Sequence, residues 1–151
     1  MPTHYQGTGE EKLALDLYIK LMRASDSVTA RLTELRTLKG LSISQFGTLE
    51  VLYHLGPMCQ KELGAKLLKS GGNMTMVLDN LEKKGYVERF RDEEDRRFVR
   101  VQLTSTGEKK LMEVLPHHVE KIVEMMNVLT PGEQEELCRL TKKLGCGVSS
   151  A

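Results

Sequence analysis

Apolar residues recur with helical spacing through the first quarter of the chain. From Glu10 to about Leu38 they follow one another at intervals of three, four or seven residues, which predicts one long helix. At 1.5 Å per residue this helix would span over ~40 Å, more than a small domain needs for its own core. We therefore expect much of it to contact a second copy of the chain. The alternative is a long helix that folds back within the monomer.

Two shorter helices are predicted next. Gly40 should break the first helix, and Ser42 or Ser44 offers a cap for the following one, which stops at Gly56-Pro57. Residues 60–68 then form a short helix that would be the first of a closely spaced pair.

The second helix of that pair is the most clearly patterned part of the chain. Ser70 can accept a backbone N–H at its start, and Gly85 closes it at its end. One of its faces is apolar and consists of Met74, Val77, Leu78 and Leu81. That face should lie in the core and leave the polar face free.

After Gly85 the apolar spacing changes from about 3.6 residues to about 2. Two alternating runs begin at Val87 and Val99, and the charged residues from Asp92 to Arg96 lie between them, which predicts a β-hairpin. A helix-turn-helix followed by a hairpin is a winged helix, whose second helix enters a DNA major groove. Arg97 near the tip suits a narrow minor groove, and Asp95 can hold its side chain extended.

Two further helical regions complete the chain. Thr104 can cap a helix that runs to about Asn127, which Pro116 should kink or split. The last helix starts with a capping box at Thr130-Pro131-Gly132-Glu133 and should end at Gly145. The apolar positions expected to join two chains are Leu17, Leu21, Leu137, Leu140 and Leu144. The alternative is that the terminal helices pack only on each other.

Two stretches, KELGAKLLKSGGNMTMVLDNLEKKGYVER and DEEDRRFVRVQLTSTGEKKL, resemble the MarR family of bacterial transcriptional regulators. The DRR tip and the LTSTG ending are their most specific parts. The resemblance implies a mainly α fold with a small β-hairpin wing, a winged helix-turn-helix with long N- and C-terminal dimerisation helices. Residues 1–151 would form a single MarR-like domain, with dimerisation helices at 10–38 and 105–145 and a DNA-binding lobe at 42–103.

The resemblance also implies a function. The chain would be a sequence-specific double-stranded DNA-binding regulator, a homodimeric repressor on a palindromic operator that a small-molecule or oxidant signal releases. The expected DNA-binding residues are Ser70, Gly72, Asn73, Thr75, Arg89, Asp95, Arg96 and Arg97. A small-molecule effector would bind near Tyr18, Met22, Phe46, His54 and Met58. Many relatives carry Arg or another polar residue where this chain has Met76.

Composition adds little to the case for DNA. The formal net charge is +1, from 22 Lys and Arg against 21 Asp and Glu, so any basic footprint must be local. The 151 residues suit one compact domain, and there is no leader and no apolar run long enough to cross a membrane, which predicts a cytoplasmic protein. Three cysteines fit a reducing compartment. Cys59, at a helix N-terminus, is either a redox-sensitive thiol or a small buried hydrophobe.

The sequence predicts neither an enzyme nor a cofactor or metal site. No nucleophile, base and orienting partner can be placed together, and adjacent His117 and His118 point about 100° apart on a helix. A second function class stays open, namely a winged helix that docks a partner protein without binding an operator. The near-zero net charge and Met76 on the DNA side favour it.

Overall fold

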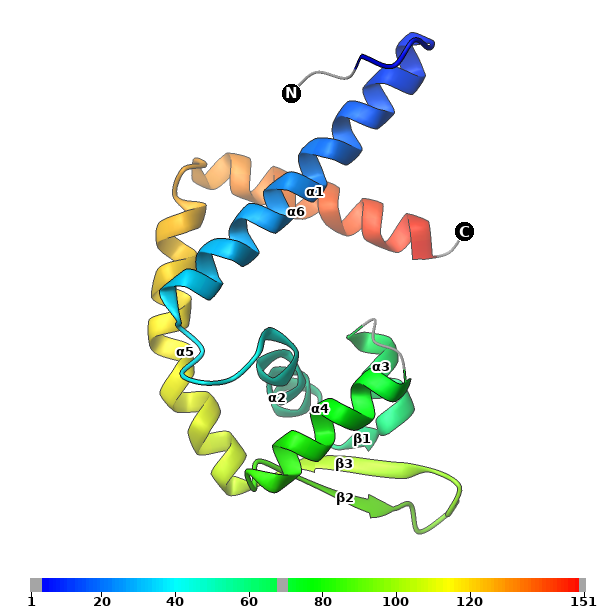
Figure 1. Cartoon of the computed structure of the whole chain (residues 1–151), viewed down its shortest axis with the longest axis vertical. Coiled ribbons are helices and arrows are strands. Elements are labelled where there is room, and N and C mark those ends of the chain that lie inside the picture. The colour runs from blue at the N-terminus through cyan, green and yellow to red at the C-terminus, as the bar shows by residue number, and fades with distance from the viewer. Residues whose placement is uncertain (1–3, 68–70, 150–151) are drawn as a thin grey trace. The chain divides into compact units, whose positions relative to one another are not determined.

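The computed structural model describes residues 4–67 and 71–149, which divide into two compact units. One unit, here called the lobe, is Thr37–Val119. The other, here called the terminal unit, comprises the described residues up to Arg36 and from Glu120 onward. The fold is mainly helical with a small antiparallel sheet, as the sequence predicts (Figure 1). The assignment of all residues to one domain stays a prediction.

The terminal unit contains α1 (Gly9–Leu35), the last turns of α5 (Ser105–Met126) and α6 (Pro131–Ser149). Thr8 starts α1 with a capping box, in which its hydroxyl accepts from Glu11 N and the Glu11 carboxylate accepts from Thr8 N. The expected end of α1 near Leu38 is wrong. Arg36 adopts a left-handed conformation with φ 49° and ends the helix before Gly40 is reached.

The predicted starts of the last two helices, α5 and α6, are confirmed, but the predicted end of α6 is not. Thr104 and Thr130 cap α5 and α6, and Thr130 N donates to the Glu133 carboxylate at 2.8 Å. Pro116 does not split α5, because side chains on both sides of the proline pack against the lobe. The expected stop at Gly145 is wrong, since this glycine does not take the positive φ that ends helices and α6 continues to Ser149.

The lobe contains α2 (Ile43–Leu55), β1 (Met58–Cys59), α3 (Gln60–Lys66), α4 (Gly71–Lys83), β2 (Val87–Arg91) and β3 (Val99–Leu103). Ser42 and not Ser44 caps α2, in a capping box with Gln45. The end of α3 comes at Lys66, and the expected last residue of that helix and the Ser70 cap lie outside the described residues.

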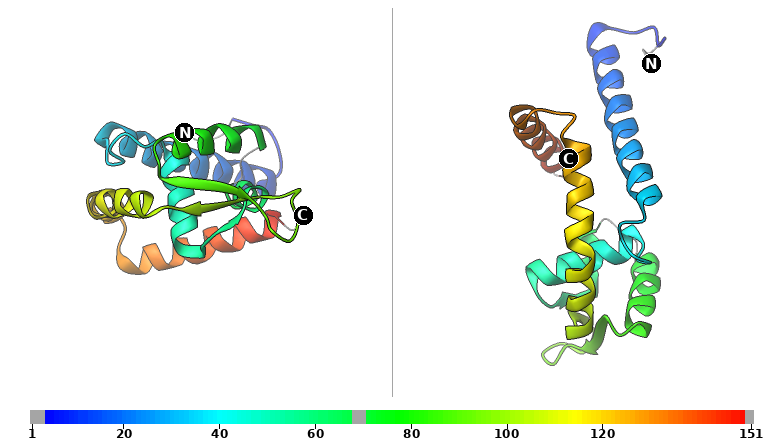
Figure 2. Two further views of the ribbon diagram at one scale, coloured as in Figure 1. Left: turned by 90° about the horizontal axis from the view of Figure 1, so that it is seen from below. Right: turned by 90° about the vertical axis from the view of Figure 1, so that its left-hand side faces the viewer.

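The predicted hairpin forms and gains a third strand. Strands β2 and β3 pair antiparallel from Val87 opposite Leu103 to Arg91 opposite Val99. Strand β1 pairs with the other edge of β3, with Met58 opposite Val101, so the strand order is β1-β3-β2. The β2–β3 hairpin extends beyond the rest of the lobe (Figure 2).

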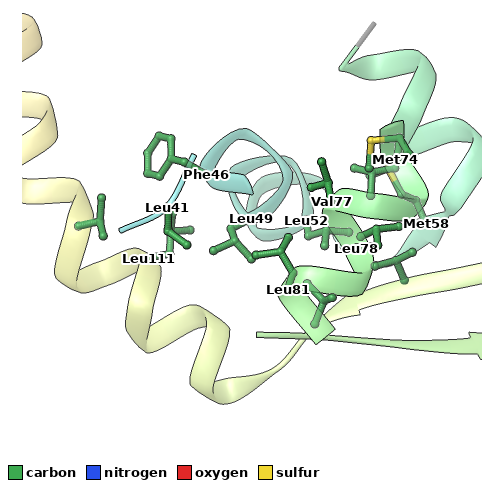
Figure 3. Close-up of a cluster of buried hydrophobic side chains, with 14 of the residues drawn as sticks. Leu41, Phe46, Leu49, Leu52, Met58, Met74, Val77, Leu78, Leu81 and Leu111 are labelled. Carbon is green, nitrogen blue, oxygen red and sulfur yellow. The ribbon is translucent and has the colours of Figure 1, made fainter. Parts of the chain in front are cut away.

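One apolar core holds the lobe together. Figure 3 shows side chains from α2, α4 and α5 meeting in this cluster, with Met58 from β1. The predicted inner face of α4 is confirmed, because Met74, Val77, Leu78 and Leu81 are all buried. Burying four such side chains stabilises the packed helix by several kcal/mol, at about 1.5–3 kcal/mol each. The orientation of α4 is therefore set by the core.

Two glycines fix how α4 leads into the wing and the wing into α5. Gly85 has φ +75°, its N–H donates to Glu82 O, and the next N–H, of Tyr86, donates to Leu81 O, the pattern of a Schellman end. Gly107 lies so close to this turn that an added Cβ would fall 2.1 Å from Tyr86 O. Thr104 joins both, since its hydroxyl donates to Gly85 O at 2.6 Å and accepts from Gly107 N.

A buried hydrogen bond joins the first and last segments of the lobe. Thr37 Oγ1 and His118 Nδ1 lie 2.8 Å apart, both side chains are buried, and the His118 ring meets Phe46 edge to face at 4.7 Å. Burial lowers the pKa of His118 below its ordinary 6.5, and the like charge of His117 acts in the same direction against the opposing effect of Glu50. The ring is therefore held neutral in the folded protein.

Because the unfolded chain accepts a proton on His118 at a higher pH than the folded chain, protonation favours unfolding below pH 6.5. Lowering the pH from about 7.5 to about 5.5 should reduce the free energy of unfolding more in the wild type than in His118→Gln. Urea unfolding at fixed protein concentration measures this. His54→Gln, a change at an exposed histidine that does not contribute to the pKa shift of His118, should keep the wild-type slope. Equal pH slopes in wild type and His118→Gln would contradict the assignment.

Candidate nucleic-acid interface

The outward face of α4 carries three of the residues expected to meet DNA. Gly72, Asn73 and Thr75 are exposed there, while Ser70 lies outside the described residues. The Thr75 hydroxyl accepts a hydrogen bond from Gln60 Nε2 at 3.1 Å, so α3 helps to position this side chain. Sequence reasoning missed Gln60, because a contact between residues fifteen positions apart has no periodic signature.

The wing tip is a self-supported turn. The Asp92 carboxylate accepts from the backbone N–H groups of Asp95 at 3.0 Å and of Glu94 at 2.8 Å, and these bonds lower the pKa of Asp92. Two backbone bonds close the loop, from Asp92 N to Phe98 O and from Phe98 N to Asp95 O, both at 3.0 Å. Arg100 reaches the same turn from β3, with Nη1 3.5 Å from Asp92 and Nη2 donating to Pro57 O.

Arg97 is highly accessible at this turn, with 85% of its side chain exposed. Its Nη2 donates to Asp95 Oδ2 at 2.7 Å and its Nε donates to Asp95 Oδ1 at 3.0 Å. The predicted bond between the two residues is therefore confirmed, and it lowers the pKa of Asp95. The guanidinium also lies 6.0 Å from the Phe98 ring centroid. Arg97 is oriented while it stays open to solvent.

Arg89 lies in a different environment from the one expected of a phosphate contact. Only 20% of its side chain is exposed, and its Nη2 donates to Asp79 Oδ1 at 2.6 Å and to Glu82 Oε1 at 3.1 Å. Its hydrogen bonds lower the pKa of Glu82, and the two acids raise the pKa of Arg89. Arg89 thus ties β2 to α4, and the exposed Arg96 is the freer basic side chain of the two candidates.

Comparison with known proteins identifies the family. The family model described as MarR family matches residues 41–99. The HTH-type transcriptional regulator YkoM of Bacillus subtilis is 35% identical over 136 residues, which cover 90% of this chain and 88% of YkoM. The chain belongs to the MarR family. MhqR of the same organism, also an HTH-type transcriptional regulator, is 34% identical over 87% of this chain and 91% of its own length.

The solved structures agree on the fold of this MarR-family regulator. AbsC of Streptomyces coelicolor, a MarR family transcriptional regulator, superposes with a TM-score of 0.76 at 21% identity. The match covers 97% of this chain and 99% of AbsC. YkoM and MhqR are transcriptional regulators. In a winged-helix fold, the exposed face of the second helix of the pair, here α4, and the wing are the parts that can meet DNA.

The five leucines expected at the dimer contact come together within the terminal unit. They line one apolar groove of about 570 Å³ between α1 and α6, here called the leucine groove. Its lining is Leu17, Leu21, Leu137, Leu140, Thr141, Lys143, Leu144, Gly147 and Val148.

The residues expected around an effector are divided between the two units. Tyr18 and Met22 are exposed on α1, whereas Phe46 and Met58 are buried in the core of the lobe. His54 is exposed and meets Tyr53 edge to face at 5.1 Å. An effector site made of these five residues stays a prediction.

Cys59 is half-buried at the start of α3, and its backbone N–H donates to the Glu62 carboxylate at 3.4 Å. A redox role for this thiol stays a prediction. Within residues 4–67 and 71–149, no three His, Cys, Asp or Glu side chains gather as a metal site. Over the same residues, no helix has both the length and the apolar character needed to cross a bilayer.

The surroundings of Arg89 and Arg97 predict different effects of their removal on stability. Arg89→Ala should lower the free energy of unfolding by about 1 kcal/mol, because it leaves Asp79 and Glu82 side by side without their shared cation. Arg97→Ala removes an exposed side chain and should leave unfolding unchanged. Urea denaturation of both variants at one protein concentration compares them, and an equal loss in both would contradict the distinction.

Proposed function

We propose that this MarR-family regulator is a homodimeric repressor that binds a palindromic double-stranded operator. Each lobe inserts α4 into a major groove, with the two half-sites about one DNA turn apart. Arg97 enters the flanking minor groove. The observation that supports this most directly is the pairing, within one packed lobe, of an exposed α4 face and a wing whose exposed Arg97 is held by an ion pair with Asp95.

The chemistry of the two elements fits their different tasks. Asn73 and Thr75 on α4 carry amide and hydroxyl groups that hydrogen-bond to base edges or phosphates, and Gly72 lets the backbone approach, since a Cβ there would meet nothing within 4 Å. A narrow minor groove concentrates negative potential, which attracts an inserted guanidinium. Arg96 adds a phosphate contact beside it. We leave Arg89 out of the DNA contacts because its charge is balanced by Asp79 and Glu82.

The leucine groove supports dimerisation. Of the described residues of α1 and α6, none is buried, although both helices carry large apolar side chains on one face. Exposed contiguous apolar surface in a soluble chain marks an interface. A second copy would cover it with the same helices, as a two-fold interface requires. A small-molecule or oxidant signal would then release DNA by changing the separation of the two lobes, because the operator binds tightly only to lobes that match the spacing of its half-sites.

A second function is favoured by one specific observation. Met76, with 60% of its surface exposed, gives the α4 face an apolar centre, which would also suit a protein partner. A salt titration of operator binding separates the two functions, since counterion release gives DNA binding a steep salt slope that protein docking lacks.

Arg97→Ala should weaken operator binding at least tenfold and reduce the dependence of log K on log salt by about one. Its effect is on binding alone, because the side chain is exposed and supports no core residue. Fluorescence anisotropy with a selected operator, repeated at several salt concentrations, measures both quantities.

Arg139→Ala is the matched control for this change. Arg139 makes a similar local ion pair, with Nη2 2.6 Å from Glu136 Oε1, but it belongs to α6 of the terminal unit and not to the wing. Its affinity for the operator should equal that of the wild type. Wild-type affinity in Arg97→Ala at physiological salt would remove the wing from the proposal.

Leu140→Glu should convert the dimer to monomer at micromolar concentration, because it buries a charge in the apolar leucine groove. Val128→Glu is the control, since Val128 is 86% exposed and lies outside the groove. Sedimentation velocity reads out both variants. A dimeric Leu140→Glu, or a monomeric wild type, would rule out this interface.

A further inference from the structure

We propose that Met76 recognises the 5-methyl group of a thymine in each operator half-site, an inference that rests on the proposed DNA-binding function. Its side chain would make an apolar base contact and thereby set part of the sequence preference.

Met76 lies near the middle of the outward face. The buried residues of α4 define the inward direction, and at roughly 100° per residue Met76 stands within about 30° of the opposite direction. Its side chain is 60% exposed, so it contributes little to the core of the lobe. A residue at this place on a recognition helix is among the first to meet the floor of the groove.

The chemistry of Met76 differs from that of its surroundings. Among the described side chains of α4, it is the one large apolar group that is exposed. Polar neighbours surround it, with Asn73 one turn before, Asn80 one turn after and Lys83 beyond. Gly72, also one turn before it, has open space where a Cβ would lie, which lets a base edge approach beside the methionine.

The major groove offers an apolar side chain one matching group. Each base pair presents hydrogen-bond donors and acceptors there, and thymine adds the 5-methyl group. A thioether side chain makes no strong hydrogen bond to the donors and acceptors, and its flexible, polarisable chain packs well on a methyl group. A pair of Met76 side chains, one from each lobe of a dimer, would therefore favour thymine at two symmetric positions.

The test removes the methyl group without changing the base pairing. An operator is first selected from random-sequence duplexes with the full-length wild-type protein, and each thymine pair is then replaced symmetrically by deoxyuridine. Dissociation constants are measured for the wild type and for Met76→Ala, Met76→Leu and Met112→Ala. Met112 is an exposed methionine on α5, so its variant controls for the loss of a methionine elsewhere.

At one thymine position the wild type and Met112→Ala should bind the deoxyuridine duplex about fourfold more weakly for each methyl removed, the effect expected of one buried CH2-sized group. Met76→Ala should bind the thymine and deoxyuridine duplexes equally at that position, and Met76→Leu should retain part of the difference. A wild type that shows no such position, or the same thymine preference in Met76→Ala, would overturn the inference while leaving DNA binding intact. A wild type that selects no duplex would overturn the proposed function as well.

Discussion

The apolar cluster shared by α2, α4, the sheet and the first turns of α5 is the constraint on which the rest of the lobe depends. It buries the inner face of α4 and the strand residues Val87 and Val101, so α4 and the wing belong to one packed body. The outward face of α4 is fixed as a consequence. The side chains proposed to read DNA need no core role of their own, and they differ from the core residues in exposure.

Ion pairs then assign different roles to arginines that look alike in the sequence. Arg89 and Arg97 each pair with acids, but Arg89 faces α4 with a fifth of its side chain exposed, whereas Arg97 projects from the tip with most of it exposed. The first pair joins two elements of the lobe. The second holds a cation extended in solvent, where orienting it in advance would lower the entropic cost of the proposed DNA contact.

The sequence predicts those features that arise from local periodicity or from residues close together along the chain. The inner face of α4, the hairpin, the cap at Thr130 and the bond between Asp95 and Arg97 are of this kind, and all are confirmed.

The features that sequence reasoning missed depend on contacts between distant residues or on exact backbone angles. Strand β1 is too short to show a periodic pattern, and the Thr37–His118 bond joins residues 81 positions apart. The alternating pattern of β2 includes Arg89, but it does not indicate that acidic side chains from α4 face this arginine. The early end of α1 depends on a left-handed arginine that no propensity favours.

The central claim is that two lobes of a dimer present α4 and the wing to one duplex. Hydroxyl-radical footprinting of the complex on a selected operator, combined with the mass of the complex from sedimentation, tests it most directly. The account predicts two chains per duplex and a two-fold symmetric protection, with major-groove half-sites about 10 base pairs apart and a protected minor groove flanking each of them. One chain per duplex, or an asymmetric footprint without the flanking minor-groove protection, would contradict it.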